Sequence, residues 1–211
     1  MHRIVLFVVY RMLMGPLLRI LLGIKWKGAY RELKQQKQFI IVANHNSHID
    51  TMALMSSLSF WQLKYTHPVA AATYFGKKKW LGWLTRFFVN TILIKRSHEG
   101  TGPKALDVLQ KYISKGHSLI IFPEGSRGEP EKLQAFHKGI GVLLEQNPQI
   151  PFVPVWITGT GKILPKGALL TVPFEASLTF GVAQFTKAKE VQDIVEEVKN
   201  AILNLNATFI P

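Results

Sequence analysis

The chain of 211 residues carries 26 Lys and Arg against 13 Asp and Glu and has no cysteine, which excludes disulfides, thiolate metal sites and a cysteine nucleophile. Its length is enough for one sizeable hydrophobic core. The charge is uneven, because residues 1–96 hold 15 Lys and Arg with two acidic residues while residues 97–211 hold 11 of each sign, and such a basic half favours contact with nucleic acid or an anionic bilayer.

The N-terminal segment is almost continuously apolar from residue 4 to residue 24. As one helix it would be about 31 Å long, which is enough to cross a hydrocarbon core. Two arginines within it are costly inside a bilayer, and Pro16 removes a helical hydrogen bond. We therefore expect two short helices, 2–14 and 16–24, that lie in the membrane interface as a monotopic anchor. The alternatives are one tilted span or an amphipathic helix folded onto the domain itself.

A run of basic residues follows the apolar segment, and we expect it to form a collar that faces anionic headgroups or, alternatively, a solvated linker. Its members are Lys25, Lys27, Arg31, Lys34 and Lys37. The sequence thus divides into an N-terminal helical membrane anchor with its basic collar, residues 1–37, and one further domain, residues 38–211.

A cluster of polar side chains, NHNSHID, follows the apolar run FIIVA at residues 39–43, which predicts a buried strand. Open α/β folds place their chemistry where such strands end. His45 can exchange a proton near neutral pH, and Asp50 is close enough along the chain to fix the imidazole tautomer and support its charge. The alternative is a polar turn between strand and helix, with Asp50 capping a helix that begins near Thr51.

Residues 51–60 predict a short helix, and residues 68–73 predict a strand of small residues. Aromatic and aliphatic side chains then alternate with cations between residues 75 and 88. This mixture suits the water–lipid boundary or a groove for a fatty chain, although a core-packing helix with a solvated lysine run explains it equally well. No recognisable nucleic-acid module accompanies the basic residues, so nucleic acid is not an expected partner.

A second polar cluster repeats the layout of the first. Residues 91–94 predict a strand that ends in Lys95 and Arg96, residues 102–116 a helix, and residues 118–122 the next buried strand. The polar cluster that follows the strand at residues 118–122 consists of Pro123, Glu124, Gly125, Ser126, Arg127 and Gly128. Two polar clusters at the ends of two buried strands predict a site assembled along one edge of a sheet.

The last third of the chain predicts further strands and two helices around the same sheet. The helices are 136–144 and 190–205, and the strands are 152–158, 169–172 and 176–185. Strands and helices alternate along the chain, so we expect an α/β domain with a mixed, largely parallel sheet flanked by helices.

The pattern of His, four residues and Asp in NHNSHID, together with FPEGSRG, resembles the motifs of the glycerophospholipid acyltransferases, the family typified by 1-acylglycerol-3-phosphate acyltransferase. The match extends to LIKR at residues 93–96 and VPV at residues 153–155, so four blocks occur in the family's order. The resemblance implies that His45 and Asp50 form the catalytic pair. It also implies a set of residues that bind the acceptor's phosphate and glycerol: Lys95, Arg96, Glu124, Gly125, Ser126 and Arg127.

Several residues depart from the family's pattern. The second block usually opens with Gly and carries Phe before the Ile, where this chain has Asn90 and Leu93. Ser126 replaces the commoner Thr, and Gly128 follows Arg127. These departures concern the acceptor headgroup rather than the type of reaction.

The chemistry of these residues agrees with the implied roles. A lysophospholipid hydroxyl is a poor nucleophile, and an imidazole base such as His45 accelerates its attack by about a hundred- to ten-thousand-fold. The planar fork of Arg127 can hold phosphate oxygens in two charge-assisted bonds. Glu124 would repel phosphate, so it orients Arg127 or hydrogen-bonds glycerol. Backbone amides near Gly125 or beside residues 153–155 are the candidates to stabilise the oxyanion.

We therefore expect an enzyme that moves an acyl chain from acyl-CoA or acyl-carrier protein to a lysophospholipid. The expected acceptor is lysophosphatidic acid, and the product is then phosphatidic acid. The donor is a co-substrate, and no other cofactor or metal is expected. The expected location is an anionic membrane surface on the cytoplasmic face of the inner or plasma membrane.

Three other functions compete for the same residues. A lipid thioesterase or hydrolase would need a Gly-x-Ser-x-Gly elbow, which the segment EGSRG misses by one place. A metal site built from His45, His48 and Asp50 matches no zinc-binding spacing. A non-catalytic membrane-binding module would explain the basic first half of the chain but not the two polar strand ends.

Overall fold

The computed structural model describes a set of ranges along the chain: residues 2–72, 87–94, 105–129, 132–163 and 175–208. Within them one seven-stranded sheet has the order β1 (Ile24–Gly28), β7 (Ala176–Phe180), β6 (Phe152–Thr158), β2 (Ile40–Ala43), β5 (Ser118–Ile121), β3 (Thr66–Ala71) and β4 (Ile92–Ile94). Neighbouring strands are parallel except for β6 and β7. The predicted α/β domain with a mixed, largely parallel sheet is confirmed.

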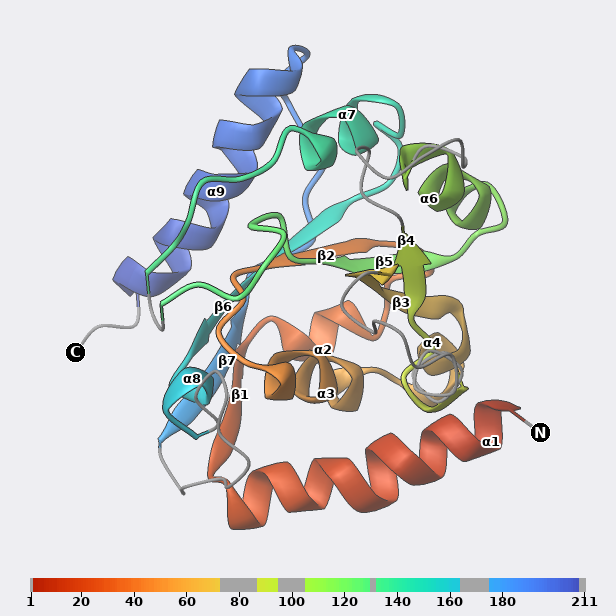
Figure 1. Ribbon diagram of the computed structural model, residues 1–211, viewed down its shortest axis with the longest axis vertical. Helices are drawn as coiled ribbons and strands as arrows, with labels where there is room; N and C mark the ends of the chain where they lie inside the picture. The colour runs from red at the N-terminus through yellow and green to blue at the C-terminus, as the bar shows by residue number, and fades with distance from the viewer. Residues whose placement is uncertain (1, 73–86, 95–104, 130–131, 164–174, 209–211) are drawn as a thin grey trace.

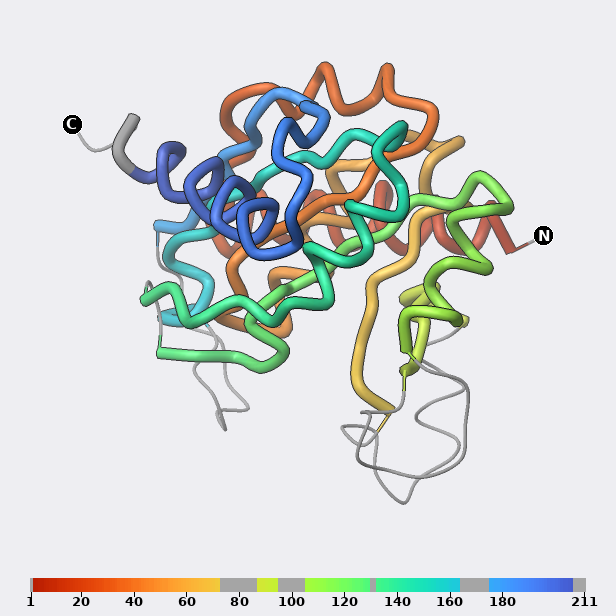
Figure 2. Tube along the Cα trace, turned by 90° about the horizontal axis from the view of Figure 1, so that it is seen from above, coloured from red at the N-terminus to blue at the C-terminus, as the bar shows by residue number. Residues whose placement is uncertain are grey.

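Helices cover both faces of the sheet (Figure 1). On one face lie α6 (Ala105–Ile113), α7 (Gly139–Glu145) and α9 (Val191–Thr208). On the other lie α2 (Tyr30–Leu33), α3 (His48–Ser57) and α4 (Phe60–Tyr65), while the short α8 (Thr160–Ile163) follows β6. The N-terminal helix packs outside α3 and α4, and Figure 2, viewed from the side of α7 and α9, places it behind the sheet.

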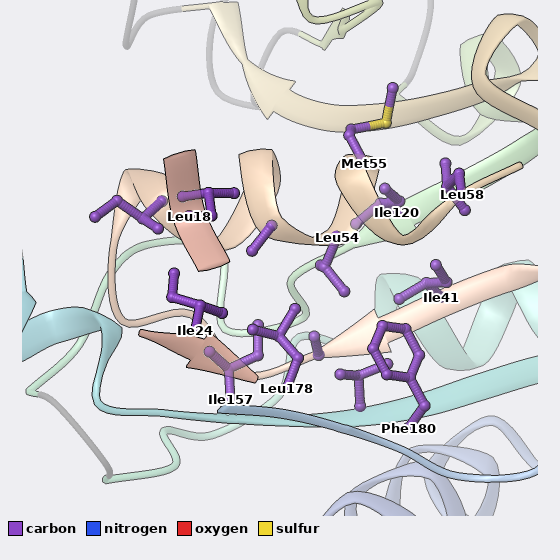
Figure 3. Packing of buried hydrophobic residues seen from close by; sticks show 14 of the residues in the cluster. Leu18, Ile24, Ile41, Leu54, Met55, Leu58, Ile120, Ile157, Leu178 and Phe180 are labelled. Atoms are coloured by element: carbon purple, nitrogen blue, oxygen red, sulfur yellow. The ribbon is translucent and has the colours of Figure 1, made fainter. Parts of the chain in front are cut away.

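The core has two halves because the central strand is buried on both faces. In β2, Ile41 and Ala43 face α3, while Ile40 and Val42 face α7 and α9, as the alternation of side chains along a strand requires. Figure 3 shows the half of the core on the α3 side, where the residues around Ile41 include some from α3, β1, β5, β6 and β7. This double burial explains why the strand reads as a continuous apolar run.

Several predicted elements are confirmed with small shifts at their ends. The strand at 152–158 has the predicted bounds, and those at 39–43 and 118–122 are each one residue shorter. The helix predicted for 51–60 begins three residues earlier, at His48, and a second helix, α4, follows it. The strand predicted at 176–185 ends at Phe180. Three predictions lie outside the described residues: the strand 169–172, most of the stretch 75–88, and the pair Lys95 and Arg96.

The prediction of two N-terminal helices separated at Pro16 is wrong. The segment His2–Leu21 is one continuous helix, made of α1 (His2–Phe7), η1 (Val8–Met14) and η2 (Leu17–Leu21). The helix stays continuous because its turns near Pro16 are π-helical: the Gly15 amide donates to the carbonyl of Tyr10, five residues back. Such i→i+5 turns accommodate a proline that lacks a donor and would crowd a regular α-helical turn.

The N-terminal helix is two-faced. Leu6, Tyr10 and Leu18 are buried in the core half on the α3 side. Its outer face carries exposed apolar side chains: Ile4, Val8, Met12, Leu13, Leu17, Ile20 and Leu21. The helix is therefore amphipathic with respect to the domain, although by length and composition alone it could also cross a membrane.

Two residues of the basic segment, Lys25 and Lys27, lie in β1, an edge strand that the sequence did not indicate. Between them, the Trp26 indole nitrogen donates to the carbonyl of Ala53 in α3, 3.1 Å away. Ile24 is buried in the core. The segment that joins the N-terminal helix to the rest of the chain is therefore part of the sheet.

Candidate active site

The two polar clusters meet at one edge of the sheet. β2 and β5 are parallel neighbours, with Val42 opposite Ile121, so their carboxyl ends lie side by side. Beyond these ends, the His45 amide donates to Glu124 Oε1 at 3.0 Å, and the Gly128 amide lies 3.4 Å from the His45 carbonyl oxygen. The structure thus brings together two segments about eighty residues apart, as the strand-end pattern predicted.

His45 and Asp50 form a hydrogen-bonded pair. His45 Nδ1 lies 3.0 Å from Asp50 Oδ2, and the carboxylate is fully buried. The same oxygen accepts the amides of Asn46 and Ser47, both at 2.7 Å. Because an ionised carboxylate only accepts hydrogen bonds, this contact assigns the ring proton to Nδ1 and leaves the Nε2 lone pair available.

The carboxylate of Asp50 also caps helix α3. Ser47 is the N-cap residue, and its hydroxyl accepts the Ile49 amide at 3.4 Å. Asp50, at the third helical position, accepts the Ser47 amide in return, which completes a capping box. The capping and catalytic interpretations of Asp50 are therefore compatible, because one oxygen can orient the imidazole and begin the helix.

The ring of His45 is held on its face as well as its edge. It stacks on Phe122 with ring centroids 4.1 Å apart and planes 20° from parallel. The His45 side chain is 16% exposed, which leaves a route for a substrate hydroxyl. Nearby, the pKa of His48 is lowered to about 4, mainly by partial desolvation of the ring and next by the positive charge of Arg127. His48 is thus neutral at pH 7. Its pKa responds to both Arg127 and His45, so these two side chains lie near the same histidine.

Glu124 is buried, with 4% of its surface exposed. One oxygen accepts the His45 amide, and the other accepts the Gln134 amide at 3.2 Å. Burial raises the pKa of Glu124, and these two hydrogen bonds oppose that rise. The next residue, Gly125, has φ +70°, and a side chain there would collide with the ring of His137. The left-handed backbone conformation therefore favours glycine at this position.

A third strand end belongs to the same site. The Asn44 side chain donates to the Ile157 carbonyl at 2.8 Å and accepts the Ile157 amide at 2.7 Å, so it continues the pairing of β2 with β6. The Asn46 side chain donates to the same carbonyl at 2.8 Å. The sequence placed Asn44 in the polar cluster without assigning it this task, and an amide directly after a buried strand is the signal that pointed to it.

Among the predicted acceptor-binding residues, Ser126 is exposed and Arg127 is half-buried on the loop after β5. Lys95 and Arg96 lie outside the described residues, directly after β4. Before that strand, Asn90 has φ +58°, a left-handed conformation that Asn tolerates better than most residues. This conformation explains how Asn stands where the family usually has Gly. Within the described ranges no three His, Asp or Glu side chains gather into a group that could hold a metal ion.

Comparison with known proteins identifies the family. The acyltransferase family matches residues 28–158, which is more than half of the chain, so the protein belongs to the acyltransferase family. The resemblance inferred from the four sequence blocks is thereby confirmed.

Among curated relatives, the chain is similar to proteins named 1-acyl-sn-glycerol-3-phosphate acyltransferase. A chloroplastic one from Brassica napus is 28% identical over 61% of this chain and 35% of its own length. One from Cocos nucifera is 28% identical over 81% of this chain and 52% of its own, and the human beta form is 29% identical over 59% and 43%. The chain thus spans between about a third and a half of these relatives.

A solved structure shares the fold. The crystal structure of the 1-acyl-sn-glycerophosphate acyltransferase PlsC from Thermotoga maritima superposes with a TM-score of 0.66 at 23% identity. The match covers 89% of this chain and 74% of that one. At this identity the likeness establishes the fold alone, and the substrates have to be argued from the site.

Proposed function

We propose that the protein transfers a fatty acyl chain from acyl-CoA or acyl-carrier protein to the free hydroxyl of lysophosphatidic acid, giving phosphatidic acid. The observation that carries this proposal is the pair of His45 with the buried Asp50 carboxylate, joined by hydrogen bonds to the loop that bears Arg127. The names of the three relatives described above, each a 1-acyl-sn-glycerol-3-phosphate acyltransferase, support the choice of acceptor.

In the proposed reaction His45 acts as the general base. Its Nε2 takes the proton of the acceptor hydroxyl while the hydroxyl oxygen forms the new ester bond to the thioester carbon. The carbon–sulfur bond then breaks, and the leaving thiolate takes the proton back from the imidazolium. Asp50 keeps Nε2 as the accepting nitrogen and stabilises the positive charge that the ring acquires between these steps. A thioester is already activated, so an acyl-enzyme is not needed.

We assign acceptor binding to the loop after β5. Arg127 is the group suited to a phosphate, because its fork can make two parallel charge-assisted bonds. Ser126 offers a hydroxyl donor on the same exposed loop, and Gly125, whose amide donates to the Phe122 carbonyl at 3.0 Å, gives the loop its left-handed turn. Lys95 and Arg96 follow β4 in the chain and would add positive charge to the phosphate site. Fixing the phosphate in this way would hold the hydroxyl near the thioester carbon.

We also propose that the outer face of the N-terminal helix lies on an anionic membrane, on the cytoplasmic side of the inner or plasma membrane. The helix's exposed apolar side chains suit the boundary between headgroups and acyl chains. Next to them, the Arg3 guanidinium lies 4.5 Å from the ring centre of Trp61, which is 67% exposed. A cation paired with an exposed indole suits the headgroup level.

The function is tested by offering a panel of lysophospholipids to the purified protein together with acyl-CoA or acyl-carrier protein. Free thiol and labelled diacyl product are measured in parallel. Thiol release that depends on lysophosphatidic acid and matches product formation would support the proposal. Thiol release without an acceptor would identify a hydrolase, and no release with any acceptor would identify a membrane-binding module.

Membrane binding needs substitutions rather than truncation, because Leu6, Tyr10 and Leu18 belong to the core. We expect the triple change of Met12, Leu13 and Ile20 to Ser to abolish co-sedimentation with anionic vesicles, since each fully buried apolar side chain is worth about 1.5–3 kcal/mol. The melting temperature should change little.

The control for the vesicle experiment replaces exposed apolar residues at a different part of the surface, Val182 and Phe185, with Ser. This double variant should bind vesicles as the parent does. Equal loss from both sets would contradict a contact made by the N-terminal helix, as would full binding by the triple variant.

A further inference from the structure

Glu124 connects three separate segments of the site through its carboxylate. Its own segment follows β5, the His45 amide that it accepts follows β2, and the Gln134 amide lies ten residues further along the chain. Each oxygen thus has one backbone donor at 3.0 Å or 3.2 Å. With only 4% of the residue exposed, little of the carboxylate is left for a substrate.

The backbone of His45 is held from both sides by the loop after β5. Glu124 accepts its amide, and the Gly128 amide lies 3.4 Å from its carbonyl oxygen. The imidazole in turn is fixed by Asp50 at Nδ1 and by the face of Phe122. Glu124 is therefore the link between the backbone that carries the proposed base and the loop that carries Arg127.

We propose that Glu124 is a positioning residue, which fixes the His45 backbone against the Arg127 loop and does not itself bind the acceptor's glycerol. This inference rests on the proposed function of His45 and Arg127. Two facts favour it over a direct contact with the acceptor. Both carboxylate oxygens already serve backbone amides, and a buried negative charge beside a bound phosphate would repel it. Small displacements of a catalytic group, of about 1 Å, can cost about a hundredfold in rate.

The test is Glu124→Gln, because an amide has one accepting oxygen and an NH2 group that would face a second donor. We expect kcat to fall by about 10- to 100-fold while the KM for lysophosphatidic acid changes by less than about threefold. The matched control is Glu129→Gln in the same loop. The Glu129 side chain is 72% exposed, and within the described residues it pairs with the exposed Lys132, so this variant should keep parental kinetics.

A second variant removes only one of the two donors. Gln134→Pro eliminates the amide that Glu124 accepts, whereas Gln134→Ala keeps that amide and removes the side chain. We expect the proline variant, but not the alanine variant, to reproduce part of the fall in kcat. This pair carries the test if Glu124→Gln does not fold, as judged by circular dichroism and melting temperature.

The outcomes separate this inference from the proposed function. A raised KM with parental kcat in Glu124→Gln would overturn the positioning role and return Glu124 to acceptor binding. Parental kcat and KM in both Glu124→Gln and Gln134→Pro would overturn it as well. Retention of activity by His45→Ala is a different result, because it would refute the base itself and hence the proposed function.

Discussion

Two histidine pairs in this molecule show how the proposed catalytic imidazole differs from a structural one. His45 has a carboxylate, Asp50, on Nδ1 and a partly exposed ring. His67 is 7% exposed, and both of its nitrogens are engaged: Nδ1 donates to the Asn90 carbonyl at 2.8 Å, and Nε2 accepts from His117 Nδ1 at 2.7 Å. Burial lowers the pKa of His67 to about 4.

The difference lies in the partners rather than in burial alone. A carboxylate stabilises the charge that a base acquires, whereas a second imidazole and a carbonyl leave no free nitrogen and no negative charge to balance a proton. The His45 pair is therefore suited to proton transfer, and the His67 pair is suited to joining β3 to the end of helix α6. Four experiments test this difference.

The largest effect is expected at His45. We expect His45→Ala to lower kcat by about a hundred- to ten-thousand-fold because the hydroxyl loses its base. The His67→Asn variant is the matched comparison, since Asn can still donate to the Asn90 carbonyl and should keep parental kcat. Steady-state thiol release with saturating lysophosphatidic acid measures both. Most of the activity surviving in His45→Ala would remove the basis of the contrast.

The second effect concerns the partner that distinguishes the two pairs. Asp50→Asn replaces an acceptor on Nδ1 with an amide that can donate, which favours the tautomer with its proton on Nε2. We expect kcat to fall by about a hundredfold, with little change in the KM for either substrate. Steady-state thiol release measures this, and a parental kcat would show that the carboxylate is not needed to set the tautomer of His45.

The strand ends and their convergence could be predicted from the sequence because they depend on local patterns. The run FIIVA is buried on both faces, and parallel neighbours bring their carboxyl ends together. The roles of Glu124 and Asn44 could not be predicted, since their partners, the amides of Gln134 and Ile157, are chosen by tertiary packing. Polar type and position along the chain do not specify which oxygen faces which amide.

The N-terminal half of the fold shows the same limit. The strand β1 was missed because its alternating lysines and Trp26 read as a basic segment, and the strand exists only by pairing with β7. Pro16 was expected to separate two helices, but wide turns and the packing of Leu6 and Tyr10 on the domain keep the helix continuous. Tertiary contacts thus create the strand β1, and they keep the N-terminal helix continuous past Pro16.

The third effect is on binding of the acceptor rather than on the proton transfer. We expect Arg127→Ala to raise the KM for lysophosphatidic acid by about 10- to 100-fold, because charge-assisted hydrogen bonds are worth about 1.5–3 kcal/mol. Arg127→Lys should recover part of the loss, since it keeps the charge without the planar fork. Acceptor titrations at saturating donor measure this. An acceptor KM that is the same in all three proteins would assign phosphate binding to other cations.

The smallest effect on activity, and the clearest on stability, is expected at His67. Its folded pKa of about 4 lies below the ordinary value of 6.5, so the unfolded chain binds more protons between these two pH values. The free energy of unfolding should therefore be independent of His67 above pH 6.5 and fall by up to about 3 kcal/mol as the pH drops to 4. Burial also lowers the pKa of His117, which adds to the fall.

Urea unfolding of the parent and of His67→Asn at pH 7.5 and pH 4.5 measures this prediction. The variant should lose less stability on acidification than the parent, while its kcat at pH 7.5 stays parental. Equal acid sensitivity in the two proteins would mean that protonation of the buried His67 does not lower the free energy of unfolding. The contrast would then rest on the partner of His45 alone, because the imidazole of His67 would tolerate a proton without a carboxylate beside it.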